Sequence, residues 1–509
     1  MSGIRISQNP LAASLAVAVF AVGCLTESHG VLAAAIAQTQ SIEFTNCLIG
    51  SGQRKARAEC ADISVPLDPN DASANQLKLK VARISARRQT ARLDAVTLVA
   101  GGPGQSALEA YANLSSAFHH VIRDRDMILI DQRGTGQSSR LDCPAASSIT
   151  NRDGQADPAH ARKLASECLE SLSQDPRLFT TSVAVQDLEI IRQRLGISQW
   201  NIYGVSYGTR VALHYLRRYP EAVRTVTLDA VVPPQIALGP QIGPLAQRAL
   251  NLIIERCQQS LGCKNAFGNI ERHIAKLLTD LEQHPRSISY EDVSTGKLVE
   301  RMFTKDDLVL TLRLMSYSSQ TASILPSMLH EAIENNNFAS LARQADQQAK
   351  QLGSSLAGGM HMSIVCTEDI PFVSEASSHS VQDPPQNGAD TYIGPGIIDS
   401  ISAGCEPWPE GRIDPDFKQP LNSDVPALIL SGGVDPITPP DYGDLVAASF
   451  KNARHIVNQQ EGHMQLPFGC MPRLLARFID EANAAELDTQ CLERLQPLPF
   501  FIDANGPLP

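Results

Sequence analysis

The chain has 509 residues, a hydrophobic content of 43% and a formal net charge of −11. This length allows a large buried core and predicts two or three domains. Because acidic residues outnumber basic ones and no basic face dominates, the composition argues against a nucleic-acid partner and fits a soluble acidic enzyme.

The first residues have the pattern of a secretory signal peptide. Arg5 is the one charged side chain before a mostly apolar run from Leu11 to Leu25, and small residues precede a cleavage position after Ala37. An apolar run of about 15 residues is shorter than the roughly 20 that a spanning helix needs. We therefore expect residues 1–37 to be removed on export to the periplasm or the medium, with no stable membrane insertion. Lipid anchoring at Cys24 is the less favoured alternative, because the residues before it lack the usual leucine.

Ten cysteines remain once Cys24 is set aside. An even set in an exported chain predicts five disulfides, and the order along the chain suggests that successive cysteines pair. A mixture of free buried thiols is the alternative. No pair has zinc-type spacing beside a suitable second pair, so no metal site is expected. The ten are Cys47, Cys60, Cys143, Cys168, Cys257, Cys263, Cys366, Cys405, Cys470 and Cys491.

The first half of the mature chain alternates strand and helix patterns. Residues 42–69 are expected to be irregular, and polar–apolar alternation over 77–84 predicts an outer antiparallel strand. Continuous apolar runs at 95–100 and 127–131 predict buried parallel strands that end at glycine-rich loops. A helix at 183–195, strands at 200–203 and 223–228, and a helix from 209 complete this part. The alternation predicts an α/β protein with a mostly parallel, twisted sheet and flanking helices.

Between about residues 236 and 420 consecutive helical patterns replace this alternation. They cover residues 245–259, 270–281, 305–315, 322–333 and 338–351, and a loop rich in serine, proline and glycine follows at 375–396. The strand and helix patterns resume at 425–432, 442–450, 454–457 and 471–484. The expected organisation is a signal peptide (1–37), a first α/β part (38–235), a helical cap insertion (236–420) and a C-terminal α/β part (421–509).

The turn after the strand at 200–203 carries the sequence Gly204-Val205-Ser206-Tyr207-Gly208. A serine flanked by glycines at a strand-to-helix turn is the nucleophile elbow of the α/β-hydrolases, where the turn is too tight for side chains at the two glycine positions. A chance match is the alternative for a five-residue motif. Ser206 is therefore the candidate nucleophile.

A serine hydroxyl needs a histidine to take its proton and an acid to orient that histidine. In α/β-hydrolases the order is serine, acid, histidine, with both partners on loops after late strands. We prefer Asp435, in a loop rich in glycine and proline, over Asp229, which ends a strand. We prefer His463, in a loop, over His455, which lies inside a predicted strand.

Acyl transfer also needs hydrogen-bond donors for the oxyanion. The Tyr207 backbone N–H is one candidate, because it follows the nucleophile. The loop Gly101-Gly102-Pro103-Gly104 follows an early strand, and we expect the Gly102 amide to be the second donor. A phosphate-cradling loop is the alternative, but no Gly-Lys-Ser or Gly-Lys-Thr follows.

The motifs at 101–104, 131–138 and 204–208, taken together, resemble the proline iminopeptidase branch of the α/β-hydrolases. The segments 180–196, 405–409 and 426–479 resemble its secreted tripeptidyl-aminopeptidase relatives, so the resemblance covers most of the mature chain. Two positions depart from the family pattern. Ala100 stands where iminopeptidases usually have a histidine, and Met464 stands where a small residue often follows the catalytic histidine.

The resemblance implies a secreted serine exopeptidase that cleaves short peptides from a free N-terminus, with no cofactor and no obligate protein partner. It also implies that acidic residues of the cap hold the substrate's α-amine, for which Glu368 and then Asp369 are the candidates. A solvated acidic pair is the alternative at these positions. An esterase with the same triad is the main alternative function. A non-catalytic binding protein on this scaffold is disfavoured, because all three triad positions carry suitable residues.

Overall fold

The computed structural model describes residues 42–52, 54–71, 75–143, 157–292, 295–373, 391–394, 396–503 and 505–507. The predicted signal peptide, Cys24 and most of the loop at 375–396 lie outside these residues. Among the helices that are described, none is long and apolar enough to cross a membrane.

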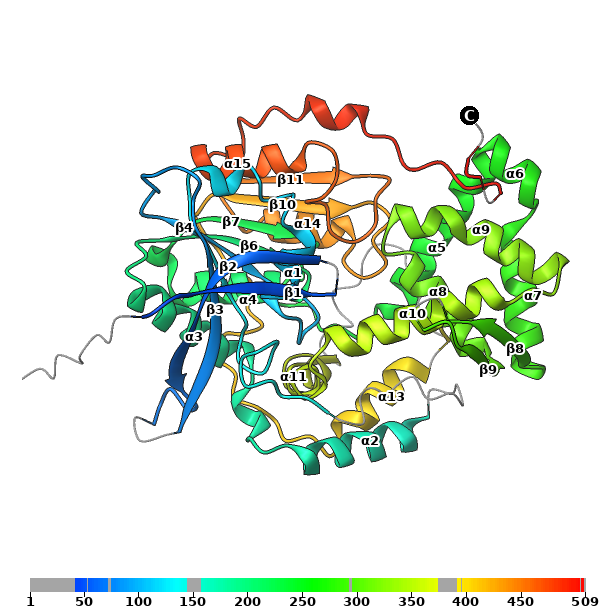
Figure 1. Cartoon of the computed structure of the whole chain (residues 1–509), viewed down its shortest axis with the longest axis horizontal. Helices are drawn as coiled ribbons and strands as arrows, with labels where there is room; N and C mark the ends of the chain where they lie inside the picture. Colours follow the sequence, from blue (N-terminus) through cyan, green and yellow to red (C-terminus); the bar gives the residue numbers. More distant parts are fainter. Residues whose placement is uncertain are drawn as a thin grey trace, which may run out of the picture. The chain divides into compact units, whose positions relative to one another are not determined.

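A mixed sheet of nine strands forms the centre of the described chain (Figure 1). In sheet order the strands are β1 (Thr45–Ser51), β2 (Arg54–Pro66), β3 (Gln76–Ile84), β5 (Met127–Ile130), β4 (Ala95–Val99), β6 (Trp200–Val205), β7 (Val223–Asp229), β10 (Ala427–Gly432) and β11 (Ala453–Asn458). The six strands from β5 to β11 are parallel, and β1, β2 and β3 extend the sheet in antiparallel fashion. The predicted α/β class with a mostly parallel sheet is confirmed.

Helices cover both faces of this sheet because its central strands are apolar on both sides. In β4, Val96 and Leu98 join a buried cluster with α1 (Ala107–Leu114) and α15 (Met471–Glu481). Ala95 and Val99, which alternate with them, join a second cluster. That cluster includes α3 (Thr181–Arg194), α4 (Tyr207–Arg218) and α14 (Pro440–Ala447).

The prediction that residues 42–69 are irregular is wrong, because they form the antiparallel pair β1–β2. Along β2, Ala61, Ile63 and Val65 are buried while Asp62 and Ser64 are exposed, which is the two-residue period of a strand. The pattern is hard to recognise in the sequence because alanine supplies several of the apolar positions and is a poor strand former. The strand β3 is antiparallel as predicted, but it is not the edge of the sheet, because β2 and β1 follow it in the sheet order.

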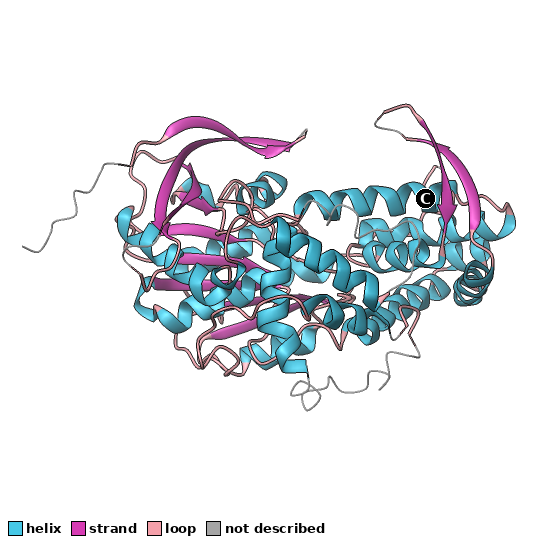
Figure 2. Cartoon of the chain, turned by 90° about the horizontal axis from the view of Figure 1, so that it is seen from below, coloured by secondary structure: helices cyan, strands magenta, loops and turns pink. Residues whose placement is uncertain are grey.

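The strands β7 and β10 are neighbours in the sheet, so the chain between them, residues 230–426, is an insertion between adjacent strands. All five helices predicted there are present. A two-stranded hairpin, which was not predicted, accompanies them and is drawn in magenta on the right of Figure 2. The elements are α5 (Ile242–Gln259), α6 (Leu261–Phe267), α7 (Ile270–Gln283), β8 (Arg286–Glu291), β9 (Leu298–Phe303), α8 (Lys305–Met315), α9 (Ser319–Glu334), α10 (Ala339–Ser355), α11 (Gly358–Ile364) and α13 (Gly396–Cys405). The helices from α5 to α10 and the hairpin share a hydrophobic cluster of their own, whereas α11 packs into a cluster of the sheet through Met360 and Ile364.

Five disulfides join successive cysteines, as predicted, with Cα atoms between 4.9 and 6.3 Å apart. The first links β1 to β2, and the second ties the segment before α2 (Pro158–Ser171) to that helix. The pairs are Cys47–Cys60, Cys143–Cys168, Cys257–Cys263, Cys366–Cys405 and Cys470–Cys491.

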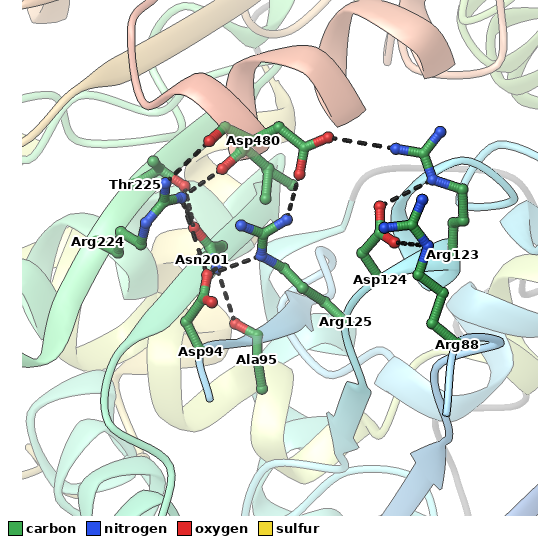
Figure 3. A network of polar contacts seen from close by, with 11 residues as sticks. Arg88, Asp94, Ala95, Arg123, Asp124, Arg125, Asn201, Arg224, Thr225 and Asp480 are labelled. Atoms are coloured by element: carbon green, nitrogen blue, oxygen red, sulfur yellow. Dashed lines mark hydrogen bonds and ion pairs between the residues drawn. The ribbon is translucent and has the colours of Figure 1, made fainter. Parts of the chain in front are cut away.

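A polar network joins the amino-terminal ends of the parallel strands to α15 (Figure 3). The Arg125 side chain is 2% exposed and donates to Asp94 at 2.7 Å and to Asp480. Asn201 of β6 also donates to Asp94 at 2.7 Å, and Arg224 of β7 donates to the Asp480 carbonyl at 3.1 Å. This network holds the end of the sheet opposite the glycine-rich loops.

Replacing Arg125 with methionine is expected to destabilise the protein by about 3 kcal/mol. The change leaves Asp94 short of one hydrogen bond at a site that is mostly buried, and breaking a buried ion pair from one side costs about 3–5 kcal/mol. We choose the lower end because Asn201 still contacts Asp94. Denaturant unfolding measures the loss, and Asp480→Asn is the matched control, with a smaller expected loss because Asp480 is 31% exposed.

The same network gives this stabilisation a pH dependence. Burial acts to raise the pKa of Asp94, but hydrogen bonds from Arg125 and Asn201 outweigh it and hold that pKa below its ordinary value of 3.8. A folded-state pKa below the unfolded one stabilises the protein above pH 3.8, and the contribution disappears as the pH falls through the folded-state value. Wild type should therefore lose part of its advantage over Arg125→Met in acid, and a constant difference down to pH 3 would contradict the assignment.

Candidate active site

Ser206 lies in the sharp turn between β6 and α4, where its φ of 54° and ψ of −128° fall outside the usual regions for a non-glycine residue. The neighbouring glycines make this turn possible. A Cβ atom on Gly208 would lie 2.1 Å from the Val99 carbonyl oxygen, and one on Gly204 would lie 2.6 Å from the Gly208 carbonyl oxygen. The turn thus has the geometry of a nucleophile elbow at the carboxyl end of the sheet.

His463 and Asp435 are in direct contact. The imidazole Nδ1 lies 2.7 Å from Asp435 Oδ2, and the Asp435 side chain is fully buried. Asp435 follows β10 and His463 follows β11, so both stand on loops at the carboxyl edge of the sheet. Because Asp435 accepts a hydrogen bond from Nδ1–H, Nε2 is the ring nitrogen left to take a proton from a nucleophile.

Asp435 is itself held by the loop that leads into α14. Its carboxylate accepts backbone hydrogen bonds from Ile437 and Thr438, both at 2.9 Å, and the Thr438 hydroxyl donates to it at 2.7 Å. The same hydroxyl lies 3.2 Å from His463 Nδ1. Thr438 was not predicted as part of the site, although the spacing Asp-x-x-Thr before a helix is a known signal for an aspartate that accepts hydrogen bonds from the backbone two or three residues on.

The surroundings of His463 set its protonation. Burial alone lowers the pKa of His463, but the charge of Asp435 and its hydrogen bond outweigh burial and raise that pKa above its ordinary value of 6.5. A histidine that acts as a base must be neutral, so activity should rise with pH through a value above 6.5.

A turn of the insertion also contacts His463. The His463 N–H donates to the Tyr317 carbonyl oxygen at 2.8 Å, and the two rings meet edge to face with centroids 5.2 Å apart. In the same turn, the Ser319 hydroxyl donates to Glu461 at 2.9 Å. The insertion therefore helps to hold the loop that carries the histidine.

Within the described residues, no hydrogen bond joins Ser206 to His463. Asp229 links them instead: its carbonyl oxygen accepts the Ser206 N–H at 2.9 Å, and its carboxylate accepts the Gln465 N–H at 2.7 Å. Catalytic hydrogen bonds are often long in proteins without substrate, so this geometry is compatible with a serine–histidine pair. Asp229 does not contact a histidine nitrogen and is not in the position of a triad acid.

The loop 101–104 lies directly against the nucleophile. A Cβ atom on Gly101 would be 3.0 Å from the Ser206 Cβ, and Gly102 has a φ of 109°. Tyr207 is the first residue of α4, where a backbone N–H has no partner within the helix. Gly102 follows Gly101 directly, so both candidate oxyanion donors belong to segments next to Ser206, and their role stays a prediction.

Glu368 and Asp369 lie in a π-helical turn that continues α11, and both are buried. Glu368 accepts hydrogen bonds from the Thr181 N–H at 2.7 Å and from the Thr181 hydroxyl at 2.9 Å. Asp369 accepts from Arg210 at 2.9 Å. Burial raises the pKa of Glu368 above its ordinary value. Both carboxylates already have protein partners, and the role of amine anchor stays a prediction.

His455, the alternative base, takes part in a separate serine–histidine–aspartate chain. Its Nε2 lies 2.8 Å from the Ser431 hydroxyl, and its Nδ1 lies 2.8 Å from Asp444. Gly443 packs directly against these hydrogen-bonded side chains, since a Cβ atom on it would lie 2.3 Å from His455 Nε2. No substrate carbonyl could reach Ser431, which excludes acyl transfer at this position.

The residues in the described part of the chain include no group of three or more histidine, cysteine, aspartate or glutamate side chains that could hold a metal ion. The groups described above are a strained serine, a histidine–aspartate pair and nearby backbone amides, which together can support acyl transfer.

Comparison with known proteins agrees with this geometry. A family model described as "alpha/beta hydrolase fold" matches residues 94–260, which confirms the predicted α/β-hydrolase fold. A second model, described as "TAP-like protein", matches residues 390–491. Together with the relatives below, these matches confirm the resemblance to the tripeptidyl aminopeptidases that the sequence motifs predicted.

Three relatives with similar sequences are two peptidases and one esterase. Tripeptidyl aminopeptidase of Streptomyces lividans is 30% identical over 218 residues, which is 40% of this chain and 40% of the relative. Serine protease Hip1 of Mycobacterium tuberculosis is 24% identical over 84% of this chain and 86% of the relative. Carboxylesterase B of Mycobacterium tuberculosis is 30% identical over 52% of this chain and 55% of the relative. The chain thus spans less than half the length of the tripeptidyl aminopeptidase that it matches.

Proposed function

We propose that the protein is an exported serine exopeptidase that hydrolyses peptide bonds near the free N-terminus of short peptides. The observation that carries the proposal is the Asp435–His463 pair at the same sheet edge as the strained Ser206. Two peptidases among the relatives favour an amide substrate. The five disulfides support export, because disulfides form in oxidising compartments.

In this proposal the Ser206 hydroxyl attacks the scissile carbonyl carbon and His463 Nε2 takes its proton. Asp435 holds the imidazole in the correct tautomer and stabilises the imidazolium that forms. The backbone amides of Gly102 and Tyr207 donate to the oxyanion of the tetrahedral intermediate. His463 then gives the proton to the leaving amine, and water releases the acyl group by the same steps in reverse.

The insertion supplies the basis for a preference for short peptides. We assign residues 236–420 to a cap over the carboxyl edge of the sheet, which is consistent with the contact between Tyr317 and His463. A cap limits access to substrates that can enter beneath it. Within it, Glu368 and Asp369 are the candidate carboxylates for the substrate's α-amine. Both lie close to α4, the helix that follows Ser206, because its Arg210 is 4.0 Å from Glu368 and 2.9 Å from Asp369.

A second function, hydrolysis of carboxylic esters, is favoured by the relative named Carboxylesterase B. The same triad would catalyse it, because an ester carbonyl needs the same nucleophile and oxyanion donors. The two functions differ in what they require of the substrate: a peptidase of this kind requires a free amine, and an esterase does not.

Chromogenic peptide amides with free and acetylated N-termini distinguish the two. We expect the free-amine substrates to react at least about 100-fold faster, because a buried carboxylate left without its ammonium partner costs several kcal/mol. Glu368→Gln should remove most of this preference while leaving slow hydrolysis of a simple activated ester. Equal rates on free and acetylated peptides, or activity on esters alone, would support the esterase function. If the preference survives Glu368→Gln, another group anchors the amine.

A further inference from the structure

Asp229 is a buried carboxylate that the proposed mechanism does not use. It is the last residue of β7 and its side chain is fully buried. The carboxylate accepts hydrogen bonds from the Tyr203 hydroxyl at 2.7 Å, from the Gln465 N–H at 2.7 Å and from the Leu466 N–H at 2.9 Å. Every one of these donors belongs to a segment next to a candidate catalytic residue.

These partners place Asp229 between the nucleophile and the base. Tyr203 is in β6, three residues before Ser206, and Gln465 and Leu466 follow His463 by two and three residues. The backbone of Asp229 completes the connection, because its carbonyl oxygen accepts the Ser206 N–H at 2.9 Å. A single residue thus holds the backbone of the elbow and the backbone of the histidine loop.

The charge of Asp229 is unusual for a purely structural link. Burial raises the pKa of Asp229 to about 6, and the described residues supply no lysine or arginine as an ion-pair partner to it. His463 is the group whose positive charge offsets it. An asparagine could not form the same link, because its NH₂ group would face a second donor, the Gln465 N–H. It would also carry no charge to offset a positive charge that develops nearby.

We propose that Asp229 is a positioning residue of the reaction: it fixes the loop after His463 against the carboxyl end of β7, and so keeps the imidazole within reach of the Ser206 hydroxyl. This inference rests on the proposed serine-hydrolase function. It assigns Asp229 no proton transfer. Among the described residues, three titratable groups then face His463: Asp435 from the loop after β10, Asp229 from the end of β7, and Tyr317 from the turn between α8 and α9.

The test compares Asp229→Asn with wild type on a simple activated ester, which does not depend on peptide recognition. A histidine loop displaced by about 1 Å can lower a rate about 100-fold, so we expect kcat to fall by up to that factor with little change in KM. The negative charge of Asp229 also helps to raise the pKa of His463. Its removal should therefore shift the acid limb of the pH–rate profile to lower pH, which a merely structural role would not do.

Asp131→Asn is the matched control. Asp131 is also a buried carboxylate directly after a strand of the same sheet, and it accepts backbone hydrogen bonds from Leu108 and Gln137. It makes no contact with the histidine loop among the hydrogen bonds of the described chain. Both substitutions remove a buried carboxylate and should lower the melting temperature, but Asp131→Asn should leave the acid limb of the pH–rate profile where it is in wild type. If Asp229→Asn keeps the wild-type kcat and acid limb, or if Asp131→Asn moves the limb equally, the inference is wrong.

Two further measurements keep the outcome clear. If Asp229→Asn does not fold, Tyr203→Phe replaces it: loss of the phenol donor should lower kcat with little change in KM, and an unchanged kcat would overturn the inference. Labelling of Ser206 by a fluorophosphonate in wild type tests the proposed function separately. Wild type that is neither labelled nor active on any ester or amide would refute the serine-hydrolase function, whereas labelled and active wild type with a normal Asp229→Asn would refute only the role of Asp229.

Discussion

Ser206→Ala should abolish turnover of every substrate, amide or ester, by about 10⁶-fold in kcat, the size of effect seen when a serine protease loses its nucleophile. The other hydroxyls of the elbow have protein partners: Thr209 donates to the Ser206 carbonyl oxygen at 2.6 Å, and the Tyr207 hydroxyl lies 2.6 Å from the Thr181 hydroxyl. The alanine keeps the Cβ atom, so the unusual backbone conformation at this position is no more strained than before. The melting temperature should therefore stay close to that of wild type while activity disappears.

Ser431→Ala is the matched control for this prediction. Ser431 is bonded to His455 in the second serine–histidine–aspartate chain, and that chain is covered by Gly443. Its loss should lower stability by about 1 kcal/mol, as for one hydrogen bond, and leave kcat nearly unchanged. Residual turnover in Ser206→Ala that is removed by Ser431→Ala would mean that the nucleophile has been assigned to the wrong serine.

The elements that position the site could be predicted because their causes are local. Continuous apolar runs mark the strands buried on both faces, and the glycines around Ser206 reflect steric contacts within a few residues of the turn. The same holds for the preference for Asp435 over Asp229, which rested on loop residues near each aspartate. The structure places Asp435 within hydrogen-bond distance of His463, and the role of Asp435 as triad acid stays a prediction.

Other features could not be predicted because they depend on contacts between distant segments. Tyr317 lies in the insertion, far from His463 in the sequence, and no local pattern indicates that their rings meet. Asp229 was identified from its position at the end of a strand, but its bonds to Gln465 and Leu466 require the fold. Likewise, the acidic residues Glu368 and Asp369 can be recognised in the sequence, whereas the hydrogen bonds that they accept from Thr181 and Arg210 cannot.

The contact between the insertion and the histidine loop has a consequence for how the enzyme would work. Tyr317 and Ser319 hold the segment from Glu461 to His463 by a backbone hydrogen bond, a ring contact and a side-chain hydrogen bond. Asp229 holds the segment just after it. The base is thus fixed from both sides, by the sheet and by the insertion, so a movement of the insertion would change the position of His463 as well as access to Ser206.

Asp435→Asn should lower kcat by about 10⁴-fold, far more than Asp229→Asn. In serine proteases the corresponding change preserves the geometry but favours the wrong histidine tautomer. Here Asp435 Oδ2 accepts a hydrogen bond from Nδ1–H, with 2.7 Å between the two heavy atoms. An asparagine could present its NH₂ group to that nitrogen instead. Thr438 does not fix the orientation of such an asparagine, because its hydroxyl can rotate either to donate to the amide oxygen or to accept from the NH₂ group.

The pH–rate profile distinguishes the two aspartates further. Asp435 makes the largest contribution that raises the pKa of His463, so residual activity in Asp435→Asn should have its acid limb at a lower pH than in Asp229→Asn. Asp444→Asn, which changes the partner of His455, is the matched control and should leave both kcat and the acid limb near wild type. If Asp435→Asn keeps near-normal activity while Asp229→Asn loses about 10⁴-fold, Asp229 is the triad acid and the contact between Asp435 and His463 only orders the loop.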